Sequence, residues 1–136
     1  MAARSKARKR ALDILFECEL RSVPLGETLD ERVLAGEPPV NEYTVVLVRG
    51  VAEHRARIDE LLSTYAQGWS LERMPTVDRN VLRIGVFEIL YVDEVPDAVA
   101  ISEAMNLVRE LSTDESPAFV NGVLGTIVRD KAKLSA

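Results

Sequence analysis

The stretch TVDRNVLRIGVFEILYV, residues 76–92, would be apolar around nearly its whole circumference if it formed a helix. A strand is the competing interpretation, because Val and Ile are common in it, but the run is about twice as long as a typical strand. Pro75 and Thr76 favour a helix start, with Thr76 as the N-cap, and a carboxylate at Asp78 suits the positive end of the helix dipole. Pro96 then ends the element. Such a helix must be covered by other helices on several sides, so the stretch predicts the centre of an all-α fold.

Helical periodicity extends along the rest of the chain, where apolar residues recur at steps of three and four. A capping box of Thr28 and Glu31 opens the second expected helix, and Asn41 and Ser116 are the expected N-caps of the third and the last. We expect helices, or a short turn for the fourth segment, at residues 3–21, 28–35, 42–68, 70–75, 76–92, 99–111 and 117–134. No change of composition divides the chain, so the sequence predicts six or seven helices in one compact domain, residues 1–136.

Composition and motif content exclude several classes of protein. Cys18 is the single cysteine and His54 the single histidine, so neither an internal disulfide nor a Cys/His zinc site can form. No catalytic motif, carboxylate pair or Gly-rich phosphate loop occurs, and we expect neither an enzyme nor a bound cofactor. No segment is long and apolar enough to span a membrane, and the basic N-terminus is not followed by a signal-peptide core. A cytoplasmic protein is expected.

Positive charge is concentrated at the N-terminus of an otherwise acidic chain. The net charge is −5, yet five of the 17 basic residues lie within the first ten positions, and none of the 22 acidic residues does. These five are Arg4, Lys6, Arg8, Lys9 and Arg10. Cations at a helix N-terminus oppose the helix dipole, which indicates a local site for an anionic ligand. A disordered basic tail is the alternative interpretation.

Two further arginines and two aromatic residues complete the candidate site. Arg79 and Arg83 lie one turn apart and are expected to face the surface or a partner, with two solvated cations as the alternative. Phe16 and Phe119 could stack on bases, although a place at the edge of the core is the more frequent role. Trp69 is expected to pack against a corner of the core. The pattern is consistent with a helical protein that binds single-stranded RNA, while an acidic adaptor for a basic protein is the alternative.

Four stretches together resemble the NusB family of bacterial transcription antitermination factors. They are ARSKARKRALDILFECEL, RGVAEHRARIDELL, WSLERMPTVDRNVLRIGVFEIL and VPDAVAISEAMNLVRELSTDESPAFVNGVLGTI. The resemblance implies an all-helical fold of two three-helix units packed across each other. It also implies a factor that binds the single-stranded boxA RNA of ribosomal RNA leaders with the ribosomal protein NusE, acts with other Nus factors and RNA polymerase, and suppresses premature termination. A helical protein-interaction adaptor without intrinsic RNA binding is the alternative.

The same resemblance implies which residues form two binding sites. The RNA-binding residues would come from the first helix, the central helix and the start of the last helix: Arg4, Lys6, Arg8, Lys9, Arg10, Phe16, Arg79, Arg83, Glu115, Ser116 and Phe119. The partner NusE would lie near Glu72 and Asp78, where an acidic body meets a basic ribosomal protein. Both a monomer and a homodimer that buries the basic face are compatible with the family.

Overall fold

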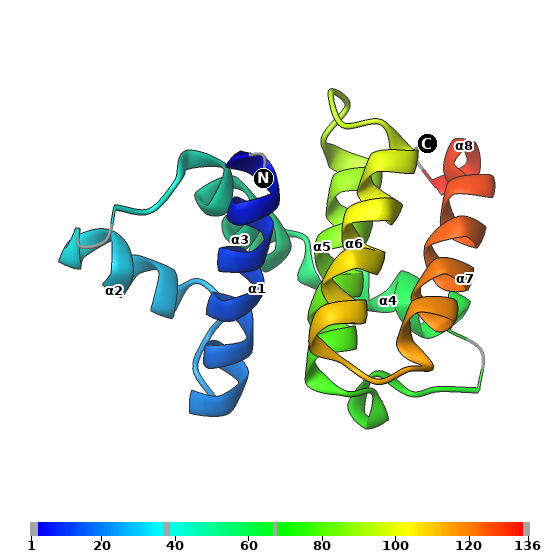
Figure 1. The fold of residues 1–136 in the computed structure, drawn as a ribbon, viewed down its shortest axis with the longest axis horizontal. Coiled ribbons are helices and arrows are strands. Elements are labelled where there is room, and N and C mark those ends of the chain that lie inside the picture. The colour runs from blue at the N-terminus through cyan, green and yellow to red at the C-terminus, as the bar shows by residue number, and fades with distance from the viewer. Residues whose placement is uncertain (1–2, 37–38, 67, 135–136) are drawn as a thin grey trace.

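The computed structural model describes residues 3–36, 39–66 and 68–134, and the regular structure within these ranges is entirely helical (Figure 1). The elements are α1 (Ala3–Arg21), α2 (Glu27–Ala35), α3 (Glu42–Glu53), α4 (Arg55–Tyr65), the 3₁₀ helix η1 (Leu71–Arg73), α5 (Thr76–Tyr91), α6 (Asp97–Leu111), α7 (Ser116–Arg129) and α8 (Lys131–Leu134). The all-α prediction is confirmed, but the described residues form eight α-helices and not six or seven. None of these helices is long and apolar enough to cross a membrane.

Helix α5 is the centre of the fold, as its composition predicts. Most of its 16 residues are buried, and it contacts α1, α3, α4, α6 and α7. The helices form two groups, with α1–α3 packed together on one side and α4–α7 on the other (Figure 1). The second group contains four long helices instead of the three expected. Both groups contribute to one buried hydrophobic cluster, which includes Leu12, Leu47, Leu82 and Leu124.

The segment expected to form one helix over residues 42–68 is instead two helices, α3 and α4, separated at His54. Helix α3 packs mainly on α1 and α5, whereas α4 packs on α5 and α7, so the chain turns where it passes between the two groups. The His54 ring stacks on Tyr91, at the end of α5, with 3.9 Å between ring centroids. Gly50 permits a close approach of α3 to α5, because a Cβ there would lie 2.1 Å from Cζ of Phe87.

The predicted helix starts are correct to within two residues, but only one predicted cap forms. The Asn41 side chain caps α3 by accepting a hydrogen bond from a backbone N–H at 2.7 Å. Thr28, Thr76 and Ser116 lie inside their helices without capping them, so these three predictions are wrong. Ser116 is buried and donates instead to Asp78 Oδ2 at 2.8 Å. The helix already begins at Ser116 and Glu115 takes the N-cap position, so the Ser116 hydroxyl does not cap α7.

Candidate nucleic-acid interface

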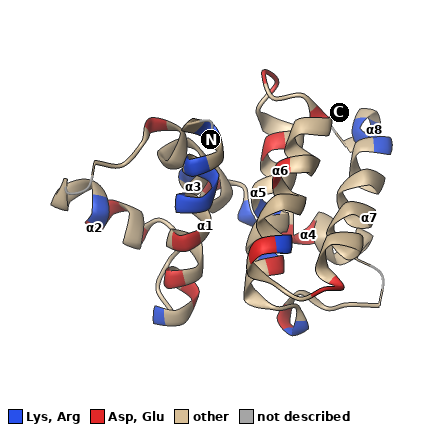
Figure 2. Ribbon diagram, viewed as in Figure 1, with Lys and Arg blue, Asp and Glu red and all other residues tan. Residues whose placement is uncertain are grey.

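The basic residues of α1 gather in its N-terminal half (Figure 2), and only some of them are exposed to solvent. Lys6 is exposed and Arg10 is half-buried, and neither forms an ion pair or a hydrogen bond with the described residues. Lys9 pairs at the surface with Asp13, one turn along the helix, at 2.8 Å. The first turn of α1 contains no acidic residue, so the positive end of the helix dipole adds to the potential. Lys6, Lys9 and Arg10 can therefore meet an anion without breaking a buried contact.

Arg4 lies at the edge of this surface. Its guanidinium carbon is 4.3 Å from the centroid of the Tyr43 ring, and Nη2 donates to Glu94 Oε1 at 2.6 Å. About two-fifths of the side chain is exposed (43%). Surface ion pairs of this kind contribute little to stability, about 0–1 kcal/mol, so Arg4 can exchange Glu94 for a ligand at low cost.

Arg8 does not lie on the basic surface, although it belongs to the same run of charge. Its side chain is 4% exposed. Nε donates to both carboxylate oxygens of Glu88, at 2.9 and 3.0 Å, and Nη1 donates to Glu103 at 2.9 Å. Burial lowers the pKa of Arg8, but the hydrogen bonds and charge of Glu88 outweigh burial and raise it overall. These bonds use Arg8 to hold α1 against α5 and α6, so its guanidinium already has carboxylate partners, and the expected phosphate contact stays a prediction.

Tyr43 of α3 joins this buried network by donating its hydroxyl hydrogen to Glu88. Burial raises the pKa of Tyr43, and the hydrogen bond and negative charge of Glu88 raise it further. The hydroxyl therefore remains protonated and keeps its role as a donor. Three helices, α1, α3 and α5, meet at the single carboxylate of Glu88, which is 1% exposed.

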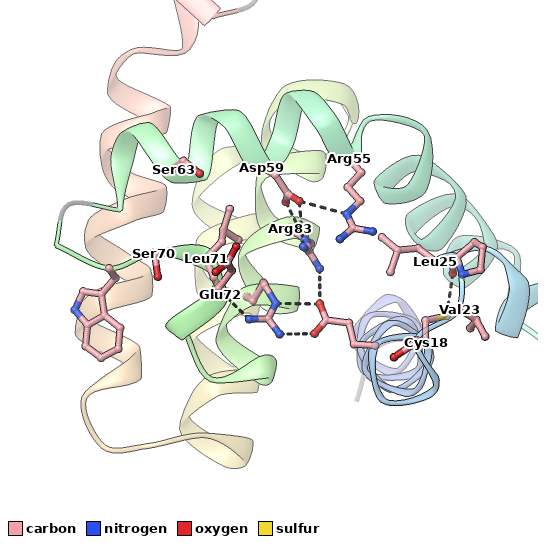
Figure 3. Close-up of a pocket in the computed structure, with 15 residues that line it drawn as sticks. Cys18, Val23, Leu25, Arg55, Asp59, Ser63, Ser70, Leu71, Glu72 and Arg83 are labelled. Carbon is pink, nitrogen blue, oxygen red and sulfur yellow. Dashed lines mark hydrogen bonds and ion pairs between the residues drawn. The ribbon is translucent and has the colours of Figure 1, made fainter.

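Arg79 and Arg83 also point into the molecule, with side chains 14% and 3% exposed. Glu19 of α1 accepts hydrogen bonds from Arg79 Nε at 3.0 Å and from Arg83 Nη1 at 2.6 Å. Arg83 also donates to both oxygens of Asp59 on α4, at 2.9 and 3.1 Å, and Asp59 pairs in turn with Arg55 (Figure 3). The expected surface location of Arg79 and Arg83 is therefore wrong. The cluster joins α1 and α4 to α5 and lines a pocket of 1190 Å³.

The charge of Glu19 is stabilised within this cluster. Burial raises the pKa of its carboxyl, but the hydrogen bonds from Arg79 and Arg83, together with their charges, outweigh burial. The pKa of Glu19 consequently lies below its usual range. The bond from Arg79 in turn is the main cause of the raised pKa of that arginine.

A groove of 680 Å³ separates α1 from α6 next to the exposed cations. Its α1 wall carries Lys6 and Lys9, and its α6 wall carries the exposed side chains Val99 and Asn106, which sequence reasoning did not single out. Phe16 lies two turns beyond Lys9 on the same helix face, half-buried and outside the hydrophobic core cluster. The groove thus combines cations, hydrogen-bonding groups and apolar surface, although the carboxylates of Glu103 and Glu110 also line its α6 wall. Cations beside apolar surface are the combination that binds single-stranded nucleic acid.

The start of α7 lies over the start of α5 and forms a second candidate surface. Glu115 is exposed, whereas Ser116 is 1% exposed and hydrogen-bonded to Asp78. Asp78 itself is 3% exposed. Of the two residues expected to meet a protein partner, therefore, only Glu72 presents its carboxylate at the surface.

Two aromatic residues cover this second surface. Phe119 is half-buried and packs against the core cluster, so it lies at the edge of the core. Trp69, which was expected to pack against a corner of the core, keeps 46% of its residue surface exposed. Its ring centroid lies 5.6 Å from that of Phe119, with 43° between the ring planes. The loop before η1 therefore contributes a half-exposed ring that packs on Phe119.

The fold and the site define a small all-helical protein with a basic surface on α1, while the rest of the molecule is acidic. Buried ion pairs hold α1 against the central apolar helix α5. Residues 5–129 match the NusB family. The chain belongs to this family.

Relatives and solved structures agree with this assignment. The chain is 65% identical over 135 residues to the transcription antitermination protein NusB of Nocardioides sp., covering 99% of this chain and 100% of the relative. It is 58% identical to the corresponding protein of Thermobifida fusca, covering 98% and 94%. The structure of T. maritima NusB superposes with a TM-score of 0.85 at 34% identity, covering 96% of this chain and 94% of that one. A structure of NusB and NusE in complex with dsRNA matches with a TM-score of 0.79 at 29% identity, covering 93% and 96%.

Proposed function

We propose that this protein is a transcription antitermination factor that binds the single-stranded boxA RNA of ribosomal RNA leaders together with the ribosomal protein NusE. Family membership carries the proposal, since a relative 65% identical over 99% of this chain is named a transcription antitermination protein. A related solved structure holds NusB and NusE in complex with dsRNA. Other Nus factors and RNA polymerase are the further partners. The protein acts in the cytoplasm as one RNA-binding domain, residues 1–136, and is not an enzyme.

We assign RNA binding to the exposed cations of α1 and to the groove between α1 and α6. Lys6, Lys9, Arg10 and the half-exposed Arg4 contact phosphates, while Phe16 stacks on a base. Support comes from their exposure and, for Lys6 and Arg10, from the lack of a counterion among the described residues. The three buried arginines act indirectly, because their ion pairs hold α1 in position.

We assign the contact with NusE to the acidic surface around Glu72. Glu72 is exposed and forms no ion pair with the described residues, and Asp78 adds negative potential from beneath the surface. Ribosomal proteins are basic, so opposite charges would speed the encounter and favour the correct partner.

Anisotropy of a labelled boxA RNA, measured with and without NusE over a range of salt concentrations, tests this function. The double variant Lys6→Ala/Arg10→Ala removes two exposed cations and leaves the buried ion pairs intact. Each phosphate contact on a single strand contributes about −0.7 to the slope of log K against log salt, so the variant should lose about 1.4 of that slope. The matched control is Arg49→Ala/Arg129→Ala, two exposed cations on α3 and α7 that do not line the groove.

The control variant should bind RNA like the native protein. If the native protein ignores the RNA at every salt concentration while it still associates with NusE, the adaptor function replaces RNA binding. If the native protein and Lys6→Ala/Arg10→Ala have equal salt slopes, α1 does not contact the RNA phosphates.

A further inference from the structure

Tyr43 of α3 contacts two arginines of α1. The guanidinium carbon of Arg4 is 4.3 Å from the centroid of the Tyr43 ring, and that of Arg8 is 5.7 Å from it. Arg4 and Arg8 are one helical turn apart, so both side chains reach the same ring. Their exposure differs, since the Arg8 side chain is 4% exposed and the Arg4 side chain 43%. Tyr43 therefore joins a buried arginine to one at the surface.

The Tyr43 ring is held in a defined place. The residue is 8% exposed, and its hydroxyl donates to Glu88, the same carboxylate that accepts hydrogen bonds from Arg8. A cation over the face of a tyrosine ring is attracted by the electrons of that face. A long arginine side chain at a surface otherwise moves among many rotamers, and ordering them costs free energy when a ligand binds. The ring thus orders Arg4 before any ligand arrives.

Glu94, in the loop between α5 and α6, is the counterion of Arg4. Arg4 Nη2 donates to Glu94 Oε1 at 2.6 Å, and the Glu94 side chain is 66% exposed. This is the one hydrogen bond that the Arg4 side chain forms with the described residues. A guanidinium pairs with carboxylate and phosphate oxygens in the same geometry. Glu94 therefore occupies a position that a phosphate could take.

The stability of the fold does not account for this arrangement. Arg8 already joins α1 to Glu88 of α5 and to Glu103 of α6 through buried or half-buried ion pairs. An ion pair as exposed as that of Arg4 with Glu94 adds little to such a contact. An ordered guanidinium with a weakly held counterion is instead what a binding site for an anion requires.

We propose that Tyr43 is a positioning residue for RNA binding, because its ring holds the Arg4 guanidinium in place for an RNA phosphate, which displaces Glu94. The exchange leaves the ring contact intact, since a guanidinium stacks through its face and pairs through its N–H groups. The inference rests on the proposed function and deepens it. It adds Tyr43 as a support beneath the RNA surface and Glu94 as a group that competes with the RNA.

A double-mutant cycle of Tyr43 with Arg4 tests the positioning role, with the anisotropy of labelled boxA RNA measured in the presence of NusE. Tyr43→Leu removes the ring and should weaken RNA binding about 3-fold, the range of a partly exposed cation–π contact. In the Arg4→Ala background the same change should leave the affinity unaltered, because the group that Tyr43 positions is already absent. Tyr43→Phe keeps the ring and should bind RNA within about 2-fold of the native protein.

Glu94→Gln tests the competition with the RNA. It should strengthen RNA binding about 3-fold at low salt, because the phosphate no longer replaces a charged group, and the gain should shrink as salt screens the pair. The matched control is Asp93→Asn, which neutralises the adjacent exposed carboxylate of the same loop, a side chain without an ion pair to the described residues. Both variants change the net charge equally, so a larger effect of Glu94→Gln reports the contact with Arg4.

The outcomes separate this inference from the function on which it rests. Equal weakening by Tyr43→Leu with and without Arg4 would show that Tyr43 acts only through the fold, and it would overturn the positioning role. Equal effects of Glu94→Gln and Asp93→Asn would overturn the competition, and both results leave the proposed function intact. If the native protein does not bind the RNA, the proposed function and the inference fail together. Glu94 and Asp93 are exposed, so their variants remain informative even if Tyr43→Leu lowers the stability.

Discussion

Replacing Glu19 by glutamine should destabilise the fold without touching the RNA surface. Among the described residues of α1, only Glu19 forms hydrogen bonds with the two buried arginines of α5, at 3.0 Å from Arg79 Nε and 2.6 Å from Arg83 Nη1. Removing one partner of a buried ion pair costs about 3–5 kcal/mol. Glu19 is 18% exposed, and Arg83 keeps Asp59 at 2.9 Å, so we expect a loss nearer about 2–3 kcal/mol.

Urea unfolding followed by circular dichroism at pH 7 measures this loss. With an m-value of about 2 kcal/mol/M, the midpoint should fall by about 1–1.5 M. The matched control is Asp13→Asn on the same helix, whose surface pair with Lys9 should contribute about 1 kcal/mol or less. If Glu19→Gln and Asp13→Asn unfold at the same urea concentration, the cluster does not lock α1 to α5 and the reasoning is refuted.

The pH dependence gives an independent check on the same contact. The pKa of Glu19 is lower in the folded protein than in the unfolded chain, where a glutamate titrates near about 4.3. The stability that this carboxylate contributes is therefore complete above about pH 4.3 and is lost as pH falls through the lower folded pKa. The stability difference between native protein and Glu19→Gln should be constant from neutral pH down to that region and should shrink below it.

Three further substitutions test the packing. Gly50→Ala should lower the free energy of unfolding by about 1–3 kcal/mol, because the new Cβ would lie 2.1 Å from Phe87. Gly122→Ala meets open space in α7 and should raise it by up to about 1 kcal/mol. Equal urea midpoints for the two variants would contradict this. Leu82→Ala should lose about 2–5 kcal/mol by calorimetry, since Leu82 is fully buried in α5, and a loss below about 1 kcal/mol would mean that α5 is not the centre of the core. Arg8→Ala should lose about 3–5 kcal/mol of stability, because it leaves Glu88 buried without its cation. If the variant keeps full stability and binds RNA more weakly, Arg8 contacts the RNA directly.

Local sequence patterns predicted the helices well. Apolar periodicity identified α1, α5, α6 and α7, and the nearly unbroken apolar run at residues 76–92 identified the helix that the others surround. Asn41 was recognised as a cap because capping depends on backbone groups two residues away. The break between α3 and α4 was missed because residues 42–68 continue a helical stripe through His54, and only the packing of the two halves on different helices requires a turn there.

The sequence by itself determined the helical class, the central helix, the family and the cluster of charge at the N-terminus, because each follows from residue order over short distances. Only the tertiary structure decided which charges are available. The counterions of Arg8, Arg79 and Arg83 lie 80, 60 and 64 residues away in the chain. The periodicity of one helix carries no information about a partner on another helix. A carboxylate at Glu88, within the apolar run, was a local indication that a cation is buried beside this helix. Trp69 likewise became a surface residue through the position of its loop, which residue type could not predict.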